Sequence, residues 1–310
     1  MYDKGDYPRI SLSQIDSPSG AELISAAFDS VGCFVVEGEP PGASIETSLE
    51  SWYRFKTLPE KLKMQYHHSV KRCGAKGGWL PMREAPVYMS HMDEDELHAK
   101  EFKQQFGCGM ELSTTLWPSE TECPGFSKGI QQCLKWIDGV SRRLLAGFER
   151  VLGESPGFFR YQPGYLTFSA YPARIEDQEG MRKSFGLHEH SDATVFTLLT
   201  QREQALQIKL ANGDWSSVPV LNGDDLLVLP GDWMELWTNG AVPAVRHRVC
   251  DTPYDRYSLA FFQSVTDMMV GPLDTFVSDE KPIRYPYVDS DMPYGGGESG
   301  APRWKSGLSD

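Results

Sequence analysis

The sequence predicts a mixed α+β protein, in which an α-rich N-terminal region and one long helix precede an antiparallel barrel or jelly roll. From Tyr165 onward, short strand-like runs alternate with Gly, Pro, Asn and Asp, a pattern typical of antiparallel strands joined by turns. Before that point, apolar residues recur at steps of three and four, which is the spacing of amphipathic helices.

The N-terminal region is expected to hold short helices around one strand. Ser17 is a candidate N-cap, Pro18 suits the first helical position, and Gly32 is a suitable stop. These signals predict a helix over residues 17–30, followed by a strand over 31–37 and two short helices over 46–55 and 59–66.

The next stretch, residues 67–125, is rich in Gly and Pro and contains an acidic run at 93–96. This composition predicts long loops. Because long loops inside compact domains often bind ligands, substrate contacts are expected here. The alternative for the acidic run is a mobile surface excursion.

A long helix is predicted over residues 126–152, where its apolar stripe would support one face of the sheet. The chain is thereby divided into an N-terminal cap with substrate-facing loops (1–125), a helix plus barrel core (126–270) and a C-terminal extension (271–310). We expect the three parts to form one compact unit.

Composition restricts the class of partner. The chain has 310 residues, with 43 acidic against 30 basic side chains and a formal charge of −13, which argues against nucleic-acid and anionic-membrane partners and favours a small molecule. There is neither an apolar run of about 20 residues nor a signal-like start. The six cysteines show no disulfide-like spacing, so we expect free thiols and a cytoplasmic protein.

Candidate metal ligands occur at the start of a strand-like run. If the strand that contains Val195 to Leu199 already includes residues 190–192, its two-residue period points His190 and Asp192 to the same face. An imidazole and a carboxylate on one face suit a divalent first-row metal. His188 lies two residues earlier, and we expect it to have a structural role beside the metal.

A third ligand is expected from His247, in a short strand-like segment 57 residues downstream of His190. Two His and one Asp would cover one triangular face of an octahedron and leave the other open, as in Fe(II) enzymes that bind a co-substrate and O2. Arg256 and Ser258 share a strand face further on, and a guanidinium beside a hydroxyl is a ready carboxylate clamp.

Taken together, these motifs resemble the 2-oxoglutarate- and Fe(II)-dependent oxygenases of the isopenicillin N synthase-like family. The pieces are His190-x-Asp192, His247 before Arg and Val, Arg256-x-Ser258, and Ser-Ala-Tyr171-Pro, which is similar to the family's Asn-Tyr-Tyr-Pro strand with Ser in place of Asn. The similarity covers about residues 164–265. It implies that the barrel is a distorted double-stranded β-helix.

The resemblance also implies an activity. Fe(II) would be held by His190, Asp192 and His247, and 2-oxoglutarate by Arg256, Ser258 and Tyr171. With O2, the enzyme would convert 2-oxoglutarate to succinate and CO2 while it hydroxylates, desaturates or cyclises a small molecule, as in secondary metabolism.

Two other classes of function use the same residues. One is a hydrolase or lyase in which Zn(II) on the same ligands activates water, which would leave Arg256 and Ser258 idle. The other is a non-catalytic barrel that binds a small ligand. Succinate formation that requires both Fe(II) and 2-oxoglutarate separates the oxygenase from both.

The sequence offers one lead on the substrate. Trp79 and Arg83 follow two glycines at the place where the family has a loop that faces the iron. A flat apolar wall and a bidentate cation predict a small substrate that bears a carboxylate, such as an amino acid derivative. The alternative is that Trp79 belongs to the core and that Arg83 pairs with a nearby acidic residue.

Overall fold

The computed structural model describes residues 7–38, 45–68, 77–82, 103–160, 162–173 and 186–291. Within them, eight strands form one larger sheet in the order β1-β2-β10-β7-β12-β5-β4-β3. Their bounds are β1 (Arg9–Ser11), β2 (Phe34–Glu37), β3 (Gly78–Leu80), β4 (Gln104–Gly109), β5 (Tyr165–Tyr171), β7 (Phe196–Gln201), β10 (Leu226–Pro230) and β12 (Arg256–Gln263).

A smaller sheet has the order β6-β11-β8-β9. Its strands are β6 (Leu187–His190), β8 (Leu206–Lys209), β9 (Trp215–Ser217) and β11 (His247–Val249), while β13 (Met269–Val270) and β14 (Val288–Asp289) form a separate pair. Side chains of the two sheets pack into a shared hydrophobic cluster that includes Leu199, Ile208 and Leu229. The architecture is the predicted jelly-roll core of a mixed α+β protein.

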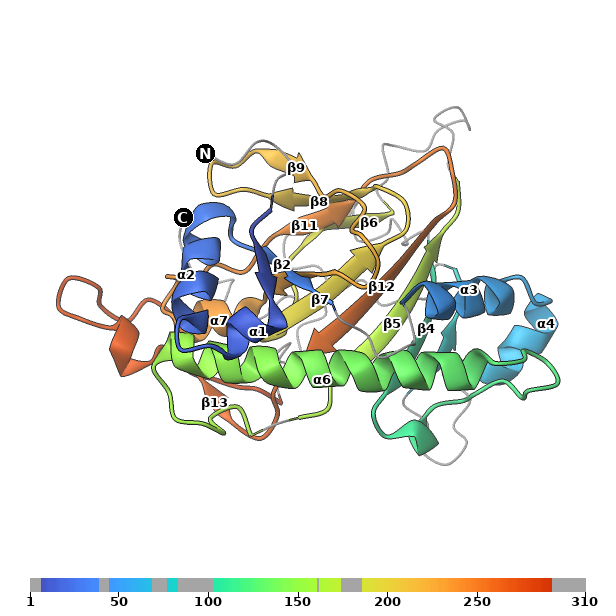
Figure 1. Ribbon diagram of the computed structural model, residues 1–310, viewed down its shortest axis with the longest axis horizontal. Coiled ribbons are helices and arrows are strands. Elements are labelled where there is room, and N and C mark those ends of the chain that lie inside the picture. Colours follow the sequence, from blue (N-terminus) through green and yellow to red (C-terminus); the bar gives the residue numbers. More distant parts are fainter. Residues whose placement is uncertain are drawn as a thin grey trace.

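Helices cover the other face of the larger sheet, where α6 (Phe126–Leu152) lies across its strands (Figure 1). The observed bounds of α6 agree with the predicted ones. The helix ends where Gly153 adopts φ 74°, a left-handed conformation that glycine tolerates without strain. The remaining helices are α1 (Leu12–Asp16), α2 (Gly20–Val31), α3 (Ile45–Lys56), α4 (Glu60–Lys63), α7 (Asp232–Trp237) and the 3-10 turns η1 (Met64–Tyr66), η2 (Leu112–Thr114) and η3 (Asp274–Phe276).

The predicted N-terminal helix over residues 17–30 is wrong at its start. Ser17 is the C-cap of α1, where its hydroxyl donates to the Gln14 carbonyl at 2.6 Å, and α2 begins only after Ser19. Ser11, not foreseen as a cap, accepts from the Gln14 backbone N–H at the start of α1. The predicted stop at Gly32 is confirmed, with φ 86°.

The expectation of long loops over 67–125 is also partly wrong, because β3 and β4 lie there. β4 pairs antiparallel with β5 along its whole length, from Gln104 opposite Ala170 to Gly109 opposite Tyr165. Position 107 in this strand requires glycine because a Cβ there would collide with the Tyr165 hydroxyl. The acidic run at 93–96 lies outside the described residues.

Two further expectations concern the chain as a whole. Five of the six cysteines lie at described positions, and all five are free thiols, as expected; Cys73 lies outside the described residues. None of the described helices has both the length and the apolar character needed to cross a membrane. The three-part division of the chain stays a prediction.

Candidate functional site

The predicted metal ligands come together where the smaller sheet meets the loop after β6. His190 ends β6 and His247 begins β11, and the two residues are direct partners in the antiparallel pair, with ring centroids 4.1 Å apart. One ligand atom from each His and one from Asp192 lie within 4.8 Å of one another.

Asp192 reaches this cluster in a different way from the one predicted. The strand stops at His190, and the backbone carbonyl of Asp192 accepts a hydrogen bond from the Asp232 N–H at the start of α7, at 2.8 Å. Asp192 is therefore held by a loop rather than by the two-residue period of a strand. Its carboxylate is oriented by the Thr197 hydroxyl, which donates to Oδ2 at 2.5 Å.

Both imidazoles are oriented by backbone carbonyls. His190 Nδ1 lies 2.8 Å from the carbonyl oxygen of His188, and His247 Nδ1 lies 3.0 Å from that of Val245. An Nδ1–H that donates to a carbonyl leaves Nε2 with a free lone pair. The Nε2 atoms of His190 and His247 face the carboxylate of Asp192 at 3.6 and 3.7 Å. His188 thus supports the site through its backbone.

The surroundings favour the neutral imidazole that a metal requires. Burial, together with the neighbouring His247, lowers the pKa of His190 to about 3, because the imidazolium form loses hydration there. His247 is 3% exposed. Two imidazole nitrogens and one carboxylate on one wall fit Fe(II), since this donor set is the facial triad of non-haem iron oxygenases.

The residues predicted to clamp a carboxylate also lie close together. Arg256 on β12 lies opposite Tyr171 on β5, and its guanidinium carbon is 4.8 Å from the centre of the tyrosine ring. Arg256 Nη1 donates to the Ser258 hydroxyl at 3.3 Å. The three side chains are buried, so the clamp lies inside the barrel rather than on its surface.

Gln201, at the end of β7, joins this cluster and was missed by sequence reasoning. Its Oε1 accepts from Arg256 Nε at 3.3 Å and from Nη2 at 3.2 Å. Gln201 lies opposite Ser258 in the sheet, so both point to the same face. An amide side chain at the end of a strand whose other residues are apolar or threonine was the available signal.

Arg256 carries a charge without a carboxylate partner among the described residues, where its hydrogen-bond partners are neutral groups. Burial lowers the pKa of Arg256, and Tyr171 and Glu203 raise it. A guanidinium still keeps its proton at neutral pH. Because buried charges are normally paired, this site is suited to an anionic ligand.

A cavity of about 590 Å³ opens beside the metal ligands. Its wall includes His190 and Asp192, together with Lys103 and side chains of the larger sheet such as Leu80, Gln105, Thr167 and Phe262. A mixed wall of this size next to a metal triad is suited to a small organic substrate.

Trp79 does not reach this cavity. It lies opposite Phe106 in the β3–β4 pair, is 2% exposed, and packs in the helix-side core while its indole N–H donates to Gln104. Its neighbours Gly78 and Leu80 line the cavity instead, because alternate residues of a strand point to opposite faces. Arg83 lies outside the described residues.

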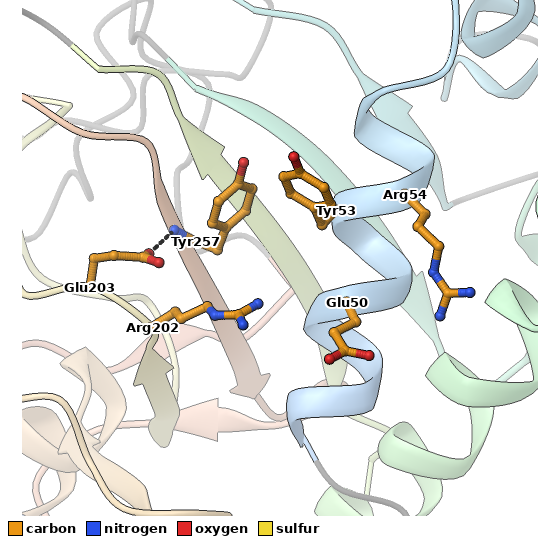
Figure 2. Close-up of a pocket in the computed structure, with 6 residues that line it drawn as sticks. All are labelled: Glu50, Tyr53, Arg54, Arg202, Glu203 and Tyr257. Atoms are coloured by element: carbon orange, nitrogen blue, oxygen red, sulfur yellow. Dashed lines mark hydrogen bonds between the residues drawn. The ribbon is translucent and has the colours of Figure 1, made fainter.

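A second pocket, of about 460 Å³, lies on the helical side between α3 and β12 (Figure 2). Tyr53 and Tyr257 meet there edge to face, with ring centroids 5.6 Å apart. Two of its charged groups have partners: Arg202 pairs with Glu46 at 2.7 Å, and Glu203 accepts the Tyr257 backbone N–H at 2.8 Å. None of the candidate metal ligands is among the residues that line this pocket.

Comparison with known proteins agrees with this geometry. Residues 158–265 match the model of the 2OG-Fe(II) oxygenase superfamily. A bi-functional coumaroyl CoA and feruloyl CoA ortho-hydroxylase from Ipomoea batatas is 27% identical over 92% of this chain and 78% of its own. Isopenicillin N synthase from Streptomyces griseus is 31% identical over 55% of this chain and 56% of its own.

Solved structures show the same fold. A full-length Neurospora crassa protein, crystallised with alpha-KG and thymine, superposes with a TM-score of 0.74 at 20% identity, over 94% of this chain and 96% of that one. The segment that matches the family model contains the His-x-Asp, the distal His and the Arg-x-Ser motifs. On these similarities the chain is an Fe(II)/2-oxoglutarate-dependent dioxygenase that acts on a small molecule.

Proposed function

We propose that His190, Asp192 and His247 hold the iron of this dioxygenase. The observation that carries the proposal is the convergence of one atom from each residue within 4.8 Å, with both Nδ1 atoms turned to backbone carbonyls. Thr197 keeps the Asp192 carboxylate in place through its hydrogen bond. Bound iron supplies the oxidative chemistry, in which 2-oxoglutarate and O2 yield succinate and CO2 and the substrate is oxidised.

Arg256, Ser258 and Tyr171 bind the distal carboxylate of 2-oxoglutarate in this proposal. The guanidinium supplies the charge and the Ser258 hydroxyl a further donor, since it accepts from Arg256 and can donate its own proton to the carboxylate. The tyrosine ring packs over the guanidinium and limits its movement. The protein thereby orients the co-substrate and excludes water from its charged end.

The experiment is an anaerobic reconstitution followed by exposure to O2. We expect succinate from 2-oxoglutarate only when Fe(II) is present, at a low rate without substrate and a higher rate with it. Zn(II) in place of Fe(II) should give none. Hydrolysis of a test ester supported by Zn(II), without any Fe(II)-dependent succinate, would instead favour the hydrolase alternative.

The substrate we propose is a small molecule that bears a carboxylate. Lys103, just before β4, and Gln105, on β4, both line the cavity beside the metal ligands. Lys103 is only 7% exposed and belongs to this wall. The relatives differ in substrate, with coumaroyl CoA and thymine among the compounds named for them, so the wall of this chain's own cavity is the better guide.

A metabolite screen that reads succinate release would identify candidates, and Lys103→Met then tests the anchor. We expect at least about tenfold weaker binding of a carboxylate substrate, since a hydrogen bond to a charged group contributes about 1.5–3 kcal/mol. The amide of that substrate should bind both proteins equally. Affinity for 2-oxoglutarate should not change.

Lys63→Met is the matched control. Lys63 is also 7% exposed but donates to the Lys56 carbonyl and lies over the Trp79 ring, away from the cavity wall. Its loss should leave substrate affinity unchanged. If Lys103→Met binds the carboxylate substrate as tightly as the parent does, the anchor is wrong while the oxygenase assignment stands.

A further inference from the structure

Arg256 presents two usable sides of its planar guanidinium. Nε–H and one Nη2–H point along one edge of the group, and both donate to a single atom, Oε1 of Gln201, at 3.3 and 3.2 Å. The Nη1 end lies beside the Ser258 hydroxyl, at 3.3 Å. The edge that faces Gln201 is therefore occupied before any ligand arrives.

Gln201 is itself fixed by backbone groups. Its Oε1 also accepts from the N–H groups of Ala205 and Leu206 at 3.2 and 3.0 Å, and its Nε2 donates to the Val218 carbonyl at 2.8 Å. The side chain is 3% exposed and lies opposite Ser258 in the sheet. An amide that is held at both ends acts as a rigid acceptor and does not move with the arginine.

The charge of Gln201 matters as much as its position. A carboxylate on the same edge would pair with Arg256 and neutralise it within the barrel. A neutral amide fixes the guanidinium and leaves its positive charge to the ligand. This explains how a buried arginine can be rigid and still lack an anionic partner among the described residues.

We propose that Gln201 is the positioning residue that turns the Nη1 end of Arg256 and the Ser258 hydroxyl toward the distal carboxylate of 2-oxoglutarate, and that its neutral amide is required for this. The inference rests on the proposed function of Arg256 and Ser258. It predicts that Gln201 acts on the distal carboxylate alone and not on the end of the co-substrate that meets the metal.

The test compares two 2-oxo acids in anaerobic Fe(II)-loaded protein. 2-Oxoglutarate carries the distal carboxylate and pyruvate lacks it, so the ratio of their dissociation constants isolates the clamp. In Gln201→Glu we expect 2-oxoglutarate to bind about ten- to a hundredfold more weakly, because the new carboxylate takes the charge of Arg256. Pyruvate should bind as in the parent.

Gln263→Glu is the matched control for burying a carboxylate in the same sheet. Gln263 on β12 is 0% exposed. Its Oε1 accepts a hydrogen bond from the Ser141 hydroxyl and its Nε2 donates to the Gln162 carbonyl, and none of its hydrogen bonds is to Arg256. This variant is expected to lower the melting temperature yet keep the parental preference for 2-oxoglutarate. A merely structural role of Gln201 would make the two variants alike.

The outcomes are separable. If the parent itself shows no preference for 2-oxoglutarate over pyruvate, the clamp in the proposed function is wrong. If the parent shows it and Gln201→Glu keeps it, the inference about Gln201 is overturned. Should Gln201→Glu fail to fold, Gln201→Met, which removes the acceptor without adding charge, decides: a severalfold loss of preference supports the inference and an unchanged preference overturns it.

Discussion

The two faces of the larger sheet are both buried, yet they carry different chemistry. On β12, Tyr257, Leu259 and Phe261 point to the helices and join the main hydrophobic cluster. Their neighbours Arg256 and Ser258 point into the barrel and form the proposed carboxylate clamp. Adjacent residues of one strand thus serve stability and ligand binding in turn, because the strand period is two.

The comparison shows that burial alone does not identify a function. Arg256 and Leu259 are 1% and 0% exposed, but only the arginine has a charge that the described residues leave for a ligand. On the helical face, polar atoms form hydrogen bonds to neighbouring side chains, as where the Trp79 indole N–H donates to Gln104. The two faces should therefore respond differently to mutation, and the variants below follow in order of their expected effect on the co-substrate reaction.

The largest effect is expected from the metal ligands. Replacing His190, Asp192 or His247 by Ala removes one of three protein ligands, so Fe(II) titration should show lost affinity and succinate formation should stop. His67→Ala, at a buried histidine away from the triad, is the control and should bind iron normally. Full activity in His247→Ala would place the distal ligand elsewhere, and activity in both His190→Ala and Asp192→Ala would remove the metal assignment.

A smaller effect is expected for Arg256→Lys. An ammonium keeps the charge but loses the planar fork that meets Ser258 and Gln201. The apparent KM for 2-oxoglutarate should rise about ten- to a hundredfold, with kcat less affected, because a charge-assisted hydrogen bond contributes about 1.5–3 kcal/mol. Steady-state assays with an unchanged dependence on 2-oxoglutarate would count against the clamp.

Ser258→Ala should also weaken the binding of 2-oxoglutarate, but less than Arg256→Lys does. The lost hydroxyl is a neutral group, whose hydrogen bond contributes about 0.5–1.5 kcal/mol, so KM for 2-oxoglutarate should rise about two- to tenfold. The melting temperature should change little, since alanine fits the space. A large fall in stability without a change in KM would show that Ser258 belongs with the packing residues.

The smallest effect on the reaction is expected from Leu259→Ala, at the residue that follows Ser258 on β12. Leu259→Ala leaves a cavity on the helical face and should lower the free energy of unfolding by about 2–5 kcal/mol, measured by urea titration. KM for 2-oxoglutarate at a temperature where the variant is folded should stay at the parental value. A changed KM would mean that the two faces are coupled through the sheet.

Several parts of this protein follow from the sequence by itself. The bounds of α6 follow from it, because the apolar stripe of this 27-residue helix ends before a glycine that is free to adopt φ 74°. The residues proposed for the site do as well, since His190, Asp192, His247, Arg256 and Ser258 were selected by residue type and spacing, and the structure brings them into two clusters. Local periodicity and donor chemistry suffice for these inferences.

Tertiary structure alone decided the rest. β4 is a strand because β5 pairs with it, although its glycines read locally as a loop, and Gly107 is required by the distant Tyr165. The direction of Trp79 depends on its register with Phe106, and the role of Gln201 depends on Arg256, 55 residues away in the chain. Pairing partners and the face that a side chain takes are set by contacts between distant segments, which a local pattern does not contain.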